Sequence, residues 1–194
     1  MIRAMLDAMD QVRSEHLGEP SRTGLWIALV AACTVIGSLA FACAAPLIAV
    51  ATFAATKMRI GEGFTVVLVA WLANQLVGYL VLGYPQTWDS FGWDAAIGTA
   101  TALCFVGAVG VSRLEMLSAA MAAMGLTVAF LVYEATLFAA TTVLPSSNEA
   151  FSFPVMARVF EINAVALISL LVLYRAAVAL GLLRPLQMPN PATV

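Results

Sequence analysis

The chain contains an uncharged run of 32 residues, from Leu25 to Thr56. A continuous α-helix of that length would extend about 48 Å, because each residue adds about 1.5 Å. The hydrocarbon core of a bilayer is only about 30 Å thick. Pro46 is the expected breakpoint, because proline removes an interior helical hydrogen bond and clashes with the preceding turn. The run therefore predicts two membrane spans, at 25–43 and 46–57, with one long kinked helix as the alternative.

The rest of the chain is also strongly apolar. Apolar residues make up 62% of the sequence and charged residues only 10%, whereas soluble domains contain roughly 45–50% and roughly 25%. So few charges cannot cover a soluble protein, and its surroundings must be largely lipid. Four further stretches have the length of a span: 64–82, 95–111, 117–144 and 155–183. We therefore expect an all-α, polytopic integral membrane helix bundle of about six transmembrane helices over residues 24–184.

Basic residues indicate the orientation of this bundle. With six spans, the cytoplasmic segments hold eight of the nine lysines and arginines: Arg3, Arg13, Arg22, Lys57, Arg59, Arg113, Arg175 and Arg184. The outer connections, 84–94 and 145–154, contain none. Because lysine and arginine concentrate in cytoplasmic loops, both termini are expected in the cytoplasm and the protein in the inner (plasma) membrane. A single helix over 25–57 would instead place the N-terminus outside, and the basic residues would no longer concentrate on the cytoplasmic side.

The two ends of the chain are expected to lie outside the bundle. Residues 1–23 carry apolar side chains at helical spacing: Ile2, Met5, Leu6, Met9 and Val12. This pattern predicts an amphipathic helix on the membrane surface or against a partner. Residues 185–194 contain three prolines and are expected to form a disordered cytoplasmic tail. A cleavable signal peptide ending near Ala42 is the alternative for the N-terminal part, although its leading region would be unusually acidic.

Several functional classes are disfavoured by what the sequence contains. The three cysteines, Cys33, Cys43 and Cys104, lie in apolar stretches without metal-ligand spacing and are expected to be buried small residues. A single histidine, His16, cannot supply a histidine-rich metal or haem site. Hydrolase, zinc-protease and nucleotide-binding motifs do not occur. We therefore expect no enzyme activity, no metal and no cofactor, and the lack of a basic stripe argues against nucleic acid.

Polar residues within the predicted spans are the main candidates for function, because burial in lipid is costly. They are Asn74, Gln75, Tyr133, Glu134, Arg158 and Glu161. Together they predict a cavity that opens to the outside. Alternatively, Arg158 and Glu161, three residues apart, form an interfacial ion pair, and the amides only join helices. Asn163 is expected on a different helix face from Glu161.

The first outer connection is dense in aromatic residues, including Trp88 and Trp93. Such rings concentrate at lipid interfaces because they are amphipathic. The functional alternative is a lid whose rings stack on a flat ligand over the cavity. Phe151 and Phe153, in the second outer connection, would then contribute the opposite wall.

Small residues recur four positions apart and allow helices to approach closely. The pairs are Ala28 and Ala32, Cys33 and Gly37, Ser38 and Ala42, Gly98 and Ala102, and Ala119 and Ala123. Packing within the bundle is one interpretation. The other is a docking face for further membrane subunits, most plausible on the first span.

In size, six-span topology, orientation and alanine-rich first helix, the chain resembles the substrate-capture subunits of energy-coupling-factor vitamin transporters. The resemblance covers the whole chain but is one of architecture, so no binding residue is transferred from it. It implies an ATPase pair and a coupling membrane subunit as partners. We therefore expect a membrane-embedded component that binds or transports a small-molecule ligand. The alternative is a non-catalytic accessory or assembly subunit of a larger membrane complex.

Overall fold

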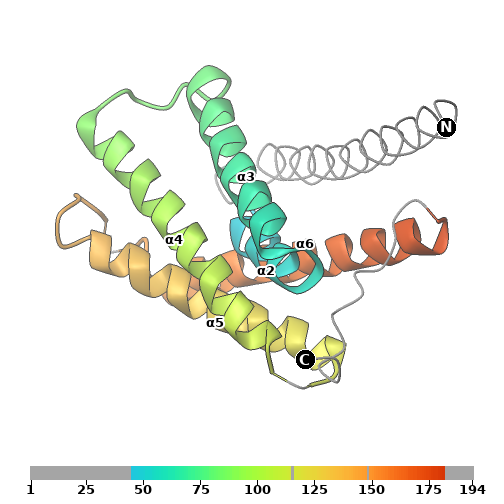
Figure 1. Ribbon diagram of the computed structural model, residues 1–194. Helices are drawn as coiled ribbons and strands as arrows, with labels where there is room; N and C mark the ends of the chain where they lie inside the picture. Colours follow the sequence, from blue (N-terminus) through green and yellow to red (C-terminus); the bar gives the residue numbers. More distant parts are fainter. Residues whose placement is uncertain (1–44, 115, 148, 182–194) are drawn as a thin grey trace, which may run out of the picture.

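The computed structural model describes residues 45–114, 116–147 and 149–181 (Figure 1). In these ranges all regular secondary structure is helical, with no strand. The helices are α2 (Leu47–Lys57), α3 (Ile60–Leu80), α4 (Trp88–Ser112), α5 (Ser118–Ala140) and α6 (Phe153–Ala179). The predictions for residues 1–23, 25–43 and 185–194 lie outside the described residues.

Four of these helices are long and apolar enough to cross a membrane: α3, α4, α5 and α6. The shortest of them, α3, has 21 residues and therefore extends about 31 Å, which matches the hydrocarbon core. In each of them at most a third of the most apolar stretch is buried inside the bundle. Such surfaces need lipid as their solvent, so the described helices are those of a multi-pass helical membrane protein.

The helix boundaries lie within four residues of the predicted ones except at the start of α4, which lies seven residues before the predicted start. The prediction placed residues 84–94 in a connection, but α4 already begins at Trp88. Thr87 adopts an extended conformation and ends the connection. Asp89 lies in the first turn of α4, where a negative charge interacts favourably with the helix dipole. Most of the aromatic segment is therefore the first two turns of a helix.

Helix α2 begins after Pro46, as the predicted break requires. It has only 11 residues, or about 16 Å, and is too short to cross a bilayer. Every residue from Leu47 to Ala54 is at most 1% exposed. The helix contacts all four long helices and lies at the centre of the bundle (Figure 1). The segment predicted as a second span is therefore a half-length helix enclosed by protein.

Small residues make this enclosure possible. A Cβ atom on Gly63 of α3 would lie 2.9 Å from the Phe105 ring of α4 and 3.2 Å from the Ala54 carbonyl oxygen of α2. On the opposite side of α2, Gly125 of α5 lies against Thr52. Without side chains at these positions, the long helices approach the backbone of α2 closely.

This packing predicts a large effect for Gly63→Leu. The new side chain would overlap both Phe105 and the α2 backbone, and overpacking of this kind costs about 1–3 kcal/mol. We expect a clear fall in the Tm of the purified protein in detergent. The control is Gly61→Leu, in the same turn of α3, where an added Cβ would meet nothing within 4 Å. Equal Tm values for the two variants would contradict the close packing.

The most extensive helix contact joins α4 and α5. Within it, the Cys104 thiol donates a hydrogen bond to the Ala129 carbonyl oxygen over 2.9 Å. Cys104 is fully buried, which confirms the prediction for this cysteine. Cys33 and Cys43 lie outside the described residues.

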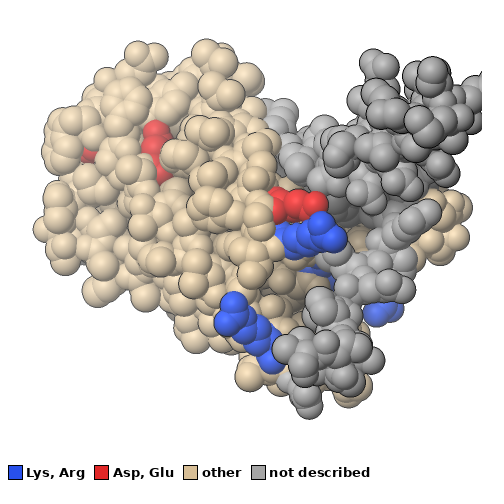
Figure 2. All heavy atoms as spheres, in the orientation of Figure 1, with Lys and Arg blue, Asp and Glu red and all other residues tan. Residues whose placement is uncertain are grey.

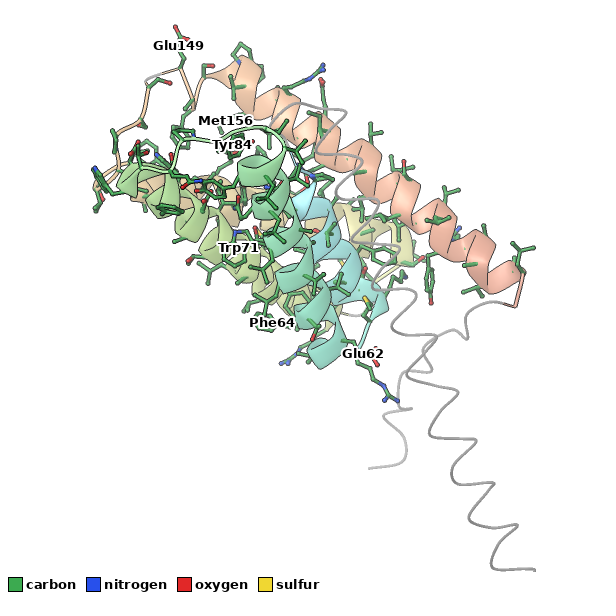
Figure 3. The ribbon with its side chains drawn as sticks, turned by 90° about the horizontal axis from the view of Figure 1, so that it is seen from above. Glu62, Phe64, Trp71, Tyr84, Glu149 and Met156 are labelled. Atoms are coloured by element: carbon green, nitrogen blue, oxygen red, sulfur yellow. The ribbon has the colours of Figure 1, made fainter. Side chains whose placement is uncertain are left out.

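The two ends of the described bundle differ in charge. Lys57, Arg59 and Arg113 lie at the end where α2 and α4 finish and α3 begins. The opposite end carries the connections 81–87 and 141–152. On the face shown in Figure 2, basic side chains gather toward the lower right with one acidic side chain beside them, and two acidic patches lie on the left. Figure 3 shows the two ends, with Glu62 at the first and Glu149 at the second.

Candidate functional site

A cavity of about 470 Å³ opens at the end of the bundle that carries the 141–152 connection. Ligand pockets in proteins typically have volumes of about 300–1,000 Å³. The described lining residues come from every helix and from the second connection: Ala45, Leu47, Ile48, Asn74, Trp93, Ile97, Tyr133, Glu134, Leu137, Pro145, Ser146, Ser147, Ala150, Phe151, Val155, Val159 and Asn163. Four of the eight residues proposed from the sequence are among them: Asn74, Trp93, Tyr133 and Glu134.

Glu134 is the one charged residue among the described lining residues. It lies on α5 and is half-buried. In the described part of the chain, no hydrogen bond or ion pair reaches its carboxylate. An uncompensated carboxylate within a membrane span is costly to bury and is a functional-site candidate for that reason. Tyr133, next to it on α5, also lines the cavity.

Asn163 fixes the start of α2 at the inner wall of the cavity. The first N–H groups of a helix lack partners within that helix, and Pro46 provides no side-chain cap. The Asn163 Oδ1 atom instead accepts a hydrogen bond from the Ala49 N–H over 3.0 Å. Its Nδ2 atom donates to the Val159 carbonyl oxygen over 2.9 Å. A buried amide on α6 therefore holds the half-length helix in place.

The sequence prediction placed Glu161, rather than Asn163, in the cavity. On α6, however, the cavity-lining residues are Val155, Val159 and Asn163, which recur every four residues on one helix face. Glu161 and Arg158 are exposed. No ion pair joins these two side chains in the part of α6 that the structure describes.

Aromatic residues form one rim of the cavity. The Trp93 Nε1–H donates a hydrogen bond to the Pro145 carbonyl oxygen over 3.1 Å and so connects α4 to the second connection. Phe151 lines the cavity and packs edge-to-face on Phe138, with ring centroids 5.5 Å apart. The other two aromatic residues of the expected lid, Trp88 and Phe153, lie outside the cavity. Trp88 is 68% exposed and Phe153 is 83% exposed, and neither lines the cavity.

Gln75 lies next to the cavity residue Asn74 but joins α3 to α4. The Gln75 side-chain amide is oriented so that both its nitrogen and its oxygen form hydrogen bonds. The nitrogen donates to Asp94 Oδ1 over 3.1 Å, and the oxygen accepts from Trp71 Nε1 over 3.0 Å. The Trp71 N–H also reaches the Asp94 carbonyl oxygen. The Tyr79 hydroxyl donates to the other carboxylate oxygen of Asp94.

Trp71, Gln75 and Tyr79 recur every four residues and therefore share one face of α3. That face binds Asp94, on α4 directly after the cavity residue Trp93. The network positions two cavity walls, those of α3 and α4, without contributing to the cavity itself. The sequence prediction missed it because Asp94 was expected in a connection.

The candidate site was compared with known proteins at the level of both sequence and structure. The sequence matches no protein-family model and no curated protein, and the structure matches no solved structure. The cavity, its Glu134 carboxylate and the buried start of α2 are therefore the observations on which a function can be proposed.

Proposed function

We propose that the chain is a membrane-embedded component that binds or transports a small solute in the cavity beside Glu134. The observation that carries the proposal is the position of Glu134, which lines the same cavity as the first residues of α2. The remaining walls combine rings, aliphatic side chains and a few polar groups. This composition is typical of small-molecule sites.

The half-length helix supports this proposal. Helix ends within a membrane are tolerated where they are buried in protein or line a cavity. Transporters place such discontinuous helices at their solute sites, where helix ends and side chains contact the solute. Helix α2 fits this pattern, because its residues from Leu47 to Ala54 are buried and its first residues, Leu47 and Ile48, line the cavity.

A compound screen tests the proposal. Purified protein in detergent is heated with amino acids, amines, vitamins, nucleobases, sugars and carboxylic acids, and its Tm is measured with each. A ligand that binds only the folded state stabilises it by about 2.7 kcal/mol at a hundredfold excess over Kd, so a true ligand raises the Tm measurably. If no compound in this set raises the Tm, the proposal fails.

Two tryptophan variants locate the binding site of any compound that raises the Tm. Trp93 lines the cavity, so Trp93→Ala is expected to reduce the rise in Tm strongly. Trp88, five residues earlier on α4, is exposed, so Trp88→Ala serves as the matched control and is expected to retain the full rise. A rise that survives Trp93→Ala but not Trp88→Ala would place binding elsewhere.

We further propose that the cavity faces the outside and that both termini lie in the cytoplasm, with the half-length helix α2 counted as the second of six spans. The clustering of Lys57, Arg59 and Arg113 at the opposite end supports this orientation. A cysteine at Ser147, on the rim of the cavity, is then expected to react with a membrane-impermeant maleimide in intact cells. A cysteine at Ser118, at the start of α5, is expected to react only after permeabilisation. The reverse pattern would contradict the orientation.

The accessory-subunit alternative has one supporting observation. Ala119 and Ala123 of α5 form a small-residue pair that is exposed on the bundle surface. Gly98 of α4, in contrast, packs against the Trp71 ring within the bundle. An exposed small-residue pair allows close approach by another helix, so the first pair fits a partner subunit. Such a partner is also what the resemblance to substrate-capture subunits implies.

A further inference from the structure

We infer that the solute of this cavity is an organic monocation: a protonated amine on an apolar body, with its charged head paired with Glu134. The inference rests on the proposed function, because it names the substrate class of the same cavity. It follows from the charge, the hydrogen-bonding groups and the apolar walls of the described lining residues.

The charge of the cavity favours a cation. Among the described lining residues, Glu134 is charged and no lysine, arginine or histidine accompanies it. A carboxylate removed from water needs an opposite charge to offset its lost hydration. A protonated amine supplies that charge and forms a short, charge-assisted hydrogen bond, whereas an anionic solute would be repelled.

The start of α2 favours the ionised carboxylate. Ala45, Leu47 and Ile48 bring the N-terminal end of α2 to the cavity, and this end of a helix dipole stabilises nearby negative charge. Most of the first N–H groups of α2 are already engaged, because those of Leu47, Ala49 and Val50 donate to Ala45, Asn163 and Pro46, which leaves little of this helix end for an anionic solute. The charge left for a solute to neutralise is therefore that of Glu134.

Further polar groups suit the head of an amine. An ammonium group has three donors and no acceptor. Glu134 can accept one of them, and Ser146 and Ser147, whose hydroxyl groups can accept hydrogen bonds, line the same cavity. The Asn163 amide is already engaged through both its oxygen and its nitrogen. It therefore forms a fixed wall rather than a binding group.

The apolar walls suit the body of the solute. Aliphatic side chains of α2, α4 and α6 line the cavity, among them Ile48, Ile97 and Val159. The rings of Trp93 and Phe151 line it as well, and a cation within about 6 Å of such a ring is attracted to its face. The volume of about 470 Å³ admits a single small molecule rather than a peptide. A compact amine with an aliphatic or aromatic body satisfies these walls.

Matched compounds test the inference. Hexylamine, 2-phenylethylamine and tryptamine are each compared with the alcohol and the carboxylate of the same body. Equilibrium binding to the full-length protein in detergent is measured by isothermal titration calorimetry. We expect at least one amine to bind, and to bind at least tenfold more tightly than its alcohol and its carboxylate.

The outcomes separate this inference from the function on which it rests. If an alcohol binds as tightly as its amine, Glu134 is protonated in the complex and the inference is overturned, while solute binding stands. If a carboxylate binds best, or if none of the amines binds, the inference is also overturned. The proposed function is then judged by the wider compound screen. It fails only if no compound in that screen raises the Tm.

Discussion

Replacing Glu134 with glutamine is expected to lower the affinity for a cationic solute by about tenfold to a hundredfold. Hydrogen bonds to charged groups contribute about 1.5–3 kcal/mol, and each 1.4 kcal/mol corresponds to about a tenfold change in Kd. Glutamine keeps the size of the side chain and removes its charge, so the cavity shape is retained. Titration calorimetry of the purified variant with the tightest-binding amine measures the change.

Glu161→Gln is the matched control for this variant. It makes the same chemical change on α6, where Glu161 is exposed and does not line the cavity. Its Kd is expected to equal that of the unmodified protein. Glu134→Asp, which keeps the charge on a shorter side chain, is expected to lose less affinity than Glu134→Gln. Equal losses for Glu134→Gln and Glu161→Gln would exclude a direct contact between Glu134 and the solute.

Replacing Asn163 with leucine is expected to destabilise the folded protein by about 1–3 kcal/mol. Leucine has a similar size but cannot accept the hydrogen bond from the Ala49 N–H. A buried donor without a partner costs about that amount, and Asn163 is only 1% exposed. The Tm in detergent, or unfolding by denaturant, measures the loss.

The control for Asn163→Leu is Ser169→Leu, on the same helix. The Ser169 hydroxyl is exposed and bonds only to the Val165 carbonyl oxygen of its own helix, so its loss leaves no buried group unpaired. We expect little change in Tm for this variant. An unchanged Tm for Asn163→Leu would show that Asn163 does not hold the start of α2.

The sequence predicted the long helices because their ends are marked by residues that lipid excludes. Turn residues and charges bound the apolar runs of α3, α5 and α6, and Pro46 marks the start of α2. The environment of α2 could not be predicted in the same way. A helix that is apolar on all sides suits lipid and a protein interior equally well, because both are apolar. Only the packing of four other helices around α2 distinguishes the two.

The candidate site was predictable in part. Glu134, Tyr133 and Asn74 were proposed as polar groups within spans and Trp93 as part of an aromatic outer cover, and all four line one cavity. Asn163 was misplaced because the rotation of α6 about its axis was unknown. The four-residue spacing of Val155, Val159 and Asn163 was the available signal. For the same reason, the sequence could not show which of the neighbours Asn74 and Gln75 faces the cavity and which faces α4.

Native mass spectrometry of the protein, extracted gently from its own membrane, tests the central claim most directly. We expect a small basic molecule to remain bound to the unmodified protein and to Glu161→Gln, and to be missing from Glu134→Gln. Its mass would identify the solute of the cavity. Stoichiometric protein partners without any bound small molecule would contradict the account, and would make the chain a subunit of a larger membrane complex instead.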